Sequence, residues 1–110
     1  MKHSAEYYIE HLEMEPHVEG GYFKECLLEK EERNLWSSIY FMLAKGEVSH
    51  FHRLKSDEVW YYHDGNALTI YMIDEAGKLT AAKLGLDLEK GEVPQVLVPK
   101  GMIFGSAMEE

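Results

Sequence analysis

Two histidines and a glutamate in the middle of the chain are the residues best suited to chemistry. They lie in the segment SHFHRLKSDEVWYYHDG, residues 49–65. Because alternate residues of a strand share a face, His50 and His52 are expected to project to the same side. Glu58, Trp60 and Tyr62 share a face for the same reason. If the two strands lie close together with these faces inward, imidazoles, a carboxylate and aromatic rings line one cavity.

Two imidazoles and one carboxylate are also the composition of a common metal site. His50, His52 and Glu58 match the 2-His-1-carboxylate set that binds non-haem iron and related divalent transition metals. One such metal ion held by this trio is therefore one interpretation. The alternative is that His50 is a solvent-tolerant surface histidine and that only His52 has a role. Asp57 adjoins Glu58 and must face the opposite side of a strand, so we assign it to a turn or a surface ion pair.

The composition excludes several classes of partner. Lys and Arg number 11 against 20 Asp and Glu, a formal charge of −9, so a phosphate backbone or an anionic lipid surface would be repelled. Cys26 is the only cysteine, which rules out an intrachain disulfide and a thiolate-rich zinc site. The first residues lack an apolar signal core, and no apolar run is long enough to span a membrane. We therefore expect a cytoplasmic protein with no nucleic-acid or membrane partner.

The pattern of apolar residues predicts one all-β domain with a short N-terminal helix. Ser4 is a typical N-cap residue, and apolar residues at helical spacing follow it until Pro16. Beyond that point, runs rich in strand formers alternate with turn residues, which favours a sandwich or a barrel. The expected strands are residues 22–29, 36–44, 47–54, 58–63, 67–74, 78–85 and 95–99.

Two glycine-containing segments are predicted to form tight hairpin turns, HDGNA at residues 63–67 and DEAGK at residues 74–78. Their glycines can take the positive φ that such turns require. Apolar residues at alternate strand positions are expected to fill the core, and these are Trp36, Phe41, Met42, Ile70 and Met72.

The segment GEVSHFHRLKSDEVWYYHDG resembles the first motif of the cupins, which runs glycine, H-x-H, glutamate, glycine. The residues that match it in order are Gly46, His50, His52, Glu58 and Gly65. The segment GEVPQVLVPKGMIFGSAM resembles the second motif, with Gly91, Pro99 and Gly101 in place. Phe104 stands at that motif's histidine position and Met108 at its asparagine position. A fourth metal ligand is therefore absent, while a three-ligand site is still permitted.

A more specific resemblance is to an uncharacterised branch of small cupins. LEMEPHVEGGYFKE at residues 12–25 resembles their PHPEGGYFRE start, and SDEVW at residues 56–60 matches their core motif. The resemblance implies a double-stranded β-helix, or jelly roll, like that of dTDP-4-dehydrorhamnose 3,5-epimerases, and a homodimer. Members usually continue with two more strands after the P-x-G segment. We therefore expect residues 1–110 to form a single cupin domain that lacks the family's last strands.

The resemblance also implies a metal-free chemistry, in which a histidine removes a proton beside a carbonyl and a tyrosine returns one. His52 would be the base, and Glu58 would orient it, because a neighbouring carboxylate fixes the imidazole tautomer and raises its basicity. Tyr22, Tyr40 or Tyr62 would be the acid, and we select Tyr22 because the branch motif includes it.

The remaining candidates are ligand-binding residues. Gly20 and Gly21 allow the backbone to approach a ligand closely, which places Glu19, Tyr22 and either Lys24 or Glu25 at the rim of the cavity. Trp60 and Tyr62 would form its wall. The alternative is that this segment is only the turn that begins the first strand and helps a dimer to form.

Three functions follow from these observations. The first is binding of a small polar ligand, such as a sugar or nucleotide-sugar, with metal-free epimerase or isomerase chemistry. The second is a metal-dependent enzyme that uses His50, His52 and Glu58. The third is a non-catalytic small-molecule binding or sensor domain. The sequence does not identify the substrate, because specificity depends on the shape of the cavity.

Overall fold

The computed structural model describes residues 3–30 and 34–108 of the chain. Helix α1 (Ala5–His11) begins where the sequence predicts, because the Ser4 hydroxyl accepts a hydrogen bond from the Tyr7 amide. It ends well before Pro16, at Leu12. Glu13 follows with a positive φ of 54°, and the Met14 amide donates to the carbonyl of Ile9. This arrangement is a Schellman termination with glutamate where glycine is usual.

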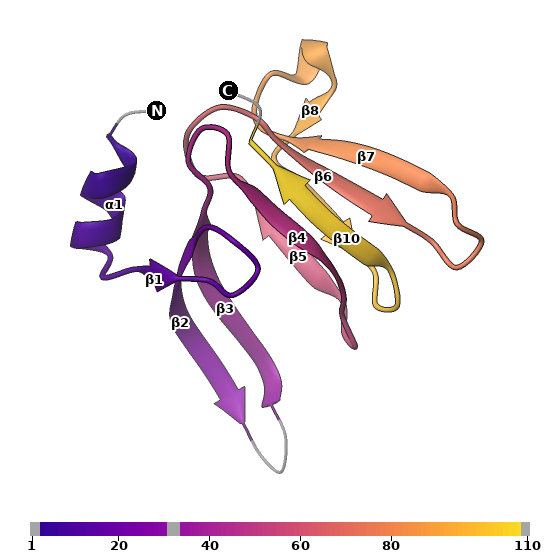
Figure 1. Cartoon of the computed structure of the whole chain (residues 1–110), viewed down its shortest axis with the longest axis horizontal. Coiled ribbons are helices and arrows are strands. Elements are labelled where there is room, and N and C mark those ends of the chain that lie inside the picture. Colours follow the sequence, from indigo (N-terminus) through magenta and orange to yellow (C-terminus); the bar gives the residue numbers. More distant parts are fainter. Residues whose placement is uncertain (1–2, 31–33, 109–110) are drawn as a thin grey trace.

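The rest of the described chain forms three antiparallel or mixed sheets, an all-β jelly roll (Figure 1). The first sheet has the order β1 (Glu15–Pro16), β2 (Tyr22–Lys30), β3 (Asn34–Met42). The second has the order β4 (Val48–Arg53), β10 (Ile103–Ala107), β6 (Leu68–Ile73), β7 (Leu79–Leu84), β8 (Glu92–Val93). The third pairs β5 (Glu58–Tyr61) with β9 (Gln95–Val98), and the 3-10 helix η1 (Leu88–Lys90) precedes β8.

The core lies mainly between the five-stranded sheet and the β5–β9 pair. Ile70 on β6, Val98 on β9 and Phe104 on β10 are almost fully inaccessible to solvent. Ile70 and Met72 are buried as the alternation predicts, whereas Phe41 and Met42 are only half-buried. The side chain of Trp36, the fifth expected core residue, lies outside the described residues.

A β-bulge interrupts the pairing of β4 with β10. Phe104 pairs with His52 and Ser106 pairs with Ser49, so two residues of β4 lie opposite Gly105 alone. A bulge changes which side chains face each side of a strand. The burial of β4 reflects this change, because Ser49 is buried, the next two residues are exposed and His52 is half-buried.

The two predicted hairpin turns differ in outcome. Residues 74–78 do join paired strands, β6 and β7, and Gly77 has a φ of 83°. Residues 63–67 do not form a hairpin, although Gly65 has a φ of 100°. They carry the chain from β5, which pairs with β9, to β6, which pairs with β7 and β10. Strand β10 was missed by the sequence analysis because Gly105 and Ser106 weaken its strand pattern.

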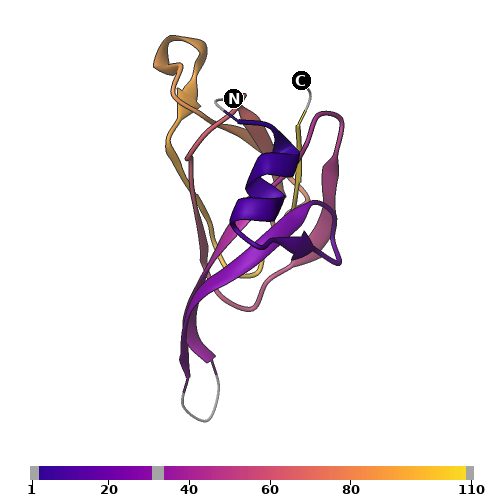
Figure 2. The same cartoon turned by 90° about the vertical axis from the view of Figure 1, so that its left-hand side faces the viewer.

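The helix and the first sheet lie to one side of the other two sheets, and the hairpin of β2 and β3 extends away from them (Figures 1 and 2). Within the described residues, no helix is both long and apolar enough to cross a membrane.

Candidate functional site

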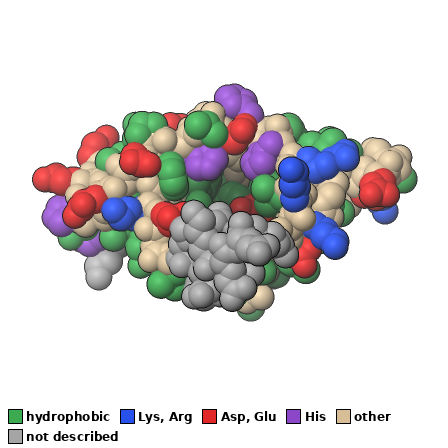
Figure 3. Space-filling view, turned by 90° about the horizontal axis from the view of Figure 1, so that it is seen from below, with side chains coloured by type: hydrophobic (Ala, Val, Ile, Leu, Met, Phe, Trp, Pro, Cys, Tyr) green, Lys and Arg blue, Asp and Glu red, His purple; other side chains and the backbone are tan. Residues whose placement is uncertain are grey.

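One cavity of about 770 Å³ brings together side chains from β3, β4, β5 and β10. This volume is in the range of small-molecule binding sites. Figure 3 shows a hollow with apolar side chains inside it and histidine side chains near its rim. Three aromatic rings join the strands around it, with Trp60 at 5.5 Å from Phe41 and 6.3 Å from Phe104 between ring centroids. The cavity therefore has a wall of packed aromatic rings.

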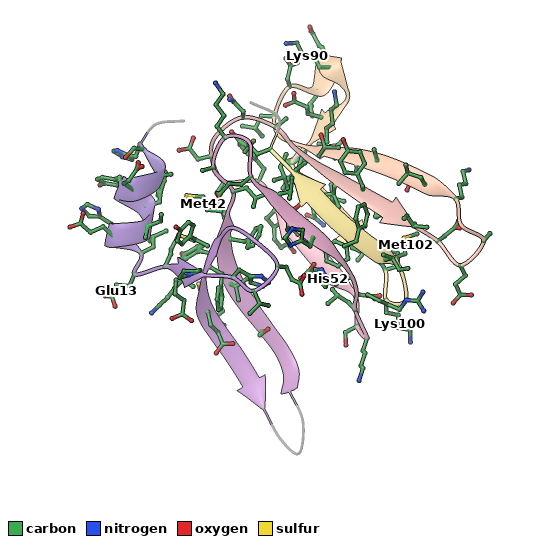
Figure 4. All side chains as sticks on the ribbon, in the orientation of Figure 1. Glu13, Met42, His52, Lys90, Lys100 and Met102 are labelled. Atoms are coloured by element: carbon green, nitrogen blue, oxygen red, sulfur yellow. The ribbon has the colours of Figure 1, made fainter. Side chains whose placement is uncertain are left out.

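His52 lines this cavity, and its ring is held on two sides. It lies on Phe104, its cross-strand partner, with ring centroids 4.5 Å apart. Its Nδ1 is 3.0 Å from the carbonyl oxygen of His50, a group that can only accept a hydrogen bond. His52 is labelled in Figure 4, where it extends from β4 near the middle of the molecule.

His50 does not share this face, so the expectation from strand alternation is wrong. The bulge places His50 and Phe51 together on the exposed side of β4. The backbone amide of His50 donates to the carbonyl oxygen of Glu19 at 2.7 Å, which ties the strand to the preceding loop. The contribution of His50 to the described structure is therefore through its backbone.

The predicted metal trio is not assembled in this structure. Among residues 3–30 and 34–108, no three His, Cys, Asp or Glu side chains are grouped so that they could hold a metal ion. Phe104, which stands where the second cupin motif has its histidine, is 1% exposed and fills the space beside His52 with an apolar ring. The donor set left by His52 and Glu58 alone does not fit a 2-His-1-carboxylate centre.

Glu58 lines the cavity, but it does not orient His52. Its Oε2 accepts a hydrogen bond of 2.9 Å from the indole Nε1 of Trp60. The two residues lie on the same face of β5, as their spacing predicts. The His52 ring instead faces a backbone carbonyl oxygen. The prediction that Glu58 orients His52 is therefore wrong.

The three candidate tyrosines differ in position. Tyr40 and Tyr62 line the cavity, whereas Tyr22 does not, because it lies on β2 and the neighbouring strand β3 forms the wall. The Tyr62 hydroxyl donates to the carbonyl oxygen of Gly65 at 2.6 Å. Burial, and then repulsion from acidic neighbours, raises the pKa of Tyr62 above its usual value. Tyr40 also lines the cavity, and within residues 3–30 and 34–108 its hydroxyl makes no hydrogen bond to the protein.

The EGGYF segment contributes one of its predicted ligand-binding side chains. Glu19 lines the cavity, while Lys24 on β2 does not. The glycines are required by packing, because a Cβ on Gly20 would lie 2.1 Å from the Val48 carbonyl oxygen and one on Gly21 would lie 2.5 Å from that of Met42. The close backbone approach is therefore to other strands of the protein.

His17 also lines the cavity, beside Phe41, and was not among the predicted site residues. The signal was present in the PHVEGGYF motif, but no strand alternation or metal-like spacing pointed to this residue. Ser49 was also missed. It lines the cavity and pairs with Ser106 through a buried hydroxyl contact of 2.6 Å.

The cavity is acidic as well as aromatic. Four carboxylates, one lysine and three histidines are among its described lining residues, and the carboxylates are Glu19, Asp57, Glu58 and Asp64. Lys55 is the lysine. Asp57 also accepts a hydrogen bond from the backbone amide of Lys100, which fits its assignment to a turn. Because it precedes β5, however, it lines the cavity together with Glu58, and the expectation that it faces the opposite side is wrong. The excess of carboxylates favours a neutral or cationic ligand over an anion.

Comparisons with known proteins identify the family. The family model described as Cupin superfamily (DUF985) matches residues 6–110. A crystal structure of a protein from Shewanella oneidensis is 57% identical, with a TM-score of 0.93, over 98% of this chain and 71% of that one. A hypothetical protein from Leishmania major is 34% identical, with a TM-score of 0.87, over 96% of this chain and 70% of that one. No curated protein matches. The chain therefore belongs to the cupin superfamily, in the family of unknown function described as DUF985.

Proposed function

We propose that the cavity binds a small, neutral or cationic, hydroxyl-rich ligand such as a sugar, and that His52 acts there as a base. The observation that carries the proposal is the combination of an aromatic wall with a fixed carboxylate. Trp60 holds one oxygen of Glu58, and the other oxygen has no protein partner in the described part of the chain. A carboxylate in this state is a strong acceptor for ligand hydroxyl or ammonium groups.

The aromatic wall supplies the second half of the recognition. Trp60 and Phe41 present large apolar surfaces that can pack against the C–H face of a sugar ring. Polar groups beside such a surface then fix the orientation of the ligand. Binding of a nucleotide-sugar has less support, because its phosphate groups call for cationic side chains. Lys55 is the one Lys or Arg among the described lining residues.

His52 supplies an acid-base group for isomerase or epimerase chemistry. Because its Nδ1 faces a carbonyl oxygen, that nitrogen carries the proton in the neutral ring, and Nε2 is left as a base. A base next to a bound α-hydroxy carbonyl compound can remove the proton beside the carbonyl. Of the tyrosines, Tyr40 fits the role of acid better than Tyr22.

A ligand panel studied by saturation-transfer NMR tests the binding. We expect neutral sugars and amino sugars to bind better than sugar phosphates or nucleotide-sugars at equal concentration. Glu58→Gln should weaken binding of the best sugar by about 10- to 100-fold, the loss of one charge-assisted hydrogen bond. Glu89→Gln on the exposed helix η1 is the matched control and should have no effect. Preferential binding of the phosphates would refute the proposal.

Turnover separates an enzyme from a binding or sensor domain. The bound sugars are incubated with the protein in D₂O, and exchange of the proton beside the carbonyl is followed by ¹H NMR. We expect exchange that is lost in His52→Asn. Tight binding with no exchange for any bound carbonyl compound would instead assign the protein to the non-catalytic class.

A further inference from the structure

Two histidines that line the cavity are held in opposite hydrogen-bonding states. The first is His17. Its Nδ1 is 3.0 Å from the backbone amide nitrogen of Glu19, which can only donate. His17 Nδ1 must therefore be unprotonated. In the neutral imidazole the proton is then on Nε2, so this nitrogen is a hydrogen-bond donor.

The second is His52, in which the roles are reversed. Its Nδ1 is 3.0 Å from the carbonyl oxygen of His50, which can only accept. His52 Nδ1 therefore carries the proton, and Nε2 has a free lone pair. In the described part of the chain, neither His17 nor His52 has a protein hydrogen-bond partner at Nε2.

Both rings are fixed by their surroundings. His17 packs edge-to-face against Phe23 at 5.1 Å and Phe41 at 5.5 Å between ring centroids. Its own backbone closes the loop, since its amide donates to Gly21 at 2.9 Å and its carbonyl accepts from Gly20 at 3.1 Å. The ring of His52 is held by its contact with Phe104, described above. Neither imidazole can turn over without breaking its hydrogen bond to the backbone.

We propose that His17 and His52 form a complementary pair in which His17 Nε2–H donates to the ligand and His52 Nε2 accepts from it. This inference rests on the proposed function, because both side chains line the same cavity. It narrows the ligand to compounds with a hydrogen-bond acceptor near a donor or an acidic C–H, which describes α-hydroxy aldehydes and α-hydroxy ketones. A neutral imidazole N–H is an effective donor to a carbonyl oxygen.

The pair also assigns a direction to the proton transfer. His52 Nε2 takes the proton from the carbon beside the carbonyl, and the C–H electron pair becomes a C=C bond. The carbonyl π electrons move to oxygen, where the His17 Nε2–H hydrogen bond stabilises the developing charge. Return of the proton from His52 to carbon restores the carbonyl, so the cycle needs no oxidant or cofactor.

The tautomers are measured directly by long-range ¹H–¹⁵N correlation NMR of the uniformly labelled protein, at a pH of about 8, above the usual histidine pKa of about 6.5. We expect His17 to be protonated on Nε2 and His52 on Nδ1. Dihydroxyacetone, a small α-hydroxy ketone, is then added as the probe. We expect the Nε2 signals of both rings to shift.

Asparagine variants test the roles without removing the backbone contacts, because the asparagine amide branches at the same position as Nδ1. His17→Asn retains an acceptor for Glu19 and His52→Asn retains a donor to the His50 carbonyl, while each loses Nε2. Exchange of dihydroxyacetone C–H protons in D₂O should fall by about 10²–10⁴-fold in His52→Asn and about 10²–10³-fold in His17→Asn. His11→Asn is the matched control, since His11 Nδ1 also faces a carbonyl, that of Tyr7, and lies outside the cavity. It should change the rate less than about twofold.

Each outcome is decisive. Opposite tautomers with shifts in both rings support the pair, and so does a loss of exchange in both cavity variants but not in the control. The same tautomer in both rings, or a response confined to His52, overturns it. Failure of the proposed function has a different signature, in which the tautomers are opposite but neither ring responds to dihydroxyacetone or to any sugar of the panel.

Discussion

Replacing Gly20 with alanine tests how the loop that carries His17 and Glu19 is held against β4. Gly20 has a φ of 115°, and an added Cβ would lie 2.1 Å from the Val48 carbonyl oxygen. Because that atom belongs to a paired strand, the loop must move away from β4. We expect the movement to break the 2.7 Å hydrogen bond from the His50 amide to the Glu19 carbonyl.

Gly46 provides the matched control. It has a φ of 79°, but an added Cβ would meet nothing within 4 Å. Gly46→Ala should therefore show the conformational cost alone, about 1–2 kcal/mol for an L-residue in a left-handed conformation. Gly20→Ala, whose φ of 115° lies farther from the left-handed region that L-residues can adopt, has at least this conformational cost. It also loses a backbone hydrogen bond, which costs about 1–3 kcal/mol when a partner is left unsatisfied. The expected total is about 2–5 kcal/mol.

Urea unfolding followed by tryptophan fluorescence measures both variants, with the free energy of unfolding extrapolated to water. A domain of this size is stable by about 5–15 kcal/mol, so both variants should fold well enough to be compared. We expect Gly20→Ala to be less stable than Gly46→Ala by about 1–3 kcal/mol. Equal losses in the two variants would refute the argument, because they would show that the contact with Val48 has no energetic consequence.

Three further predictions concern other parts of the fold. Ser49→Ala removes the hydroxyl that accepts a 3.1 Å hydrogen bond from the buried Ser106 amide, and it should lower the free energy of urea unfolding by about 1–3 kcal/mol. An unchanged free energy of unfolding would contradict a stabilising role for this hydrogen bond. Glu13→Gly should raise the thermal midpoint and increase the free energy of unfolding by about 0.5–1 kcal/mol, because Glu13 has a positive φ at the end of α1. A lower thermal midpoint would show that the positive φ of Glu13 does not strain the wild type. The raised pKa of Tyr62 means that the folded state holds this proton more tightly than the unfolded chain, so stability is full below pH about 10 and falls above it. The stability difference between the wild type and Tyr62→Phe should therefore shrink as the pH rises above about 10. A difference that stays constant with pH would show that the Tyr62 hydroxyl is not the group responsible.

Local features of the sequence were sufficient to predict the helix and the longer strands, with the exception of β10. The Ser4 cap and the alternating apolar residues of 67–74 are short-range signals, and α1 and β6 formed where these signals placed them. The motifs on both sides of β4 identified the cupin superfamily, and the Glu58 and Trp60 spacing correctly put both side chains in the cavity.

Strand pairing decided the rest, because it joins residues that are distant in the sequence. The bulge in β4 depends on its register with β10, more than fifty residues later, and no pattern within SHFHRL reveals it. That bulge, and not the H-x-H spacing, turned His50 to the outside and left His52 in the cavity. Similarly, β3 rather than β2 forms the cavity wall, so Tyr22 and Lys24 lie outside the site.

The sequence by itself therefore determined the fold class, the cupin superfamily and the segments that contain the candidate site. The tertiary structure decided which of their side chains share the cavity and which backbone groups the rings of His17 and His52 face. The physical reason is that side-chain periodicity follows from the local backbone, while register and bulges are set by the hydrogen bonds of a partner strand. His17 joined the site because the Gly20–Gly21 turn packs against β4 and β3, and only the folded chain brings these segments into contact.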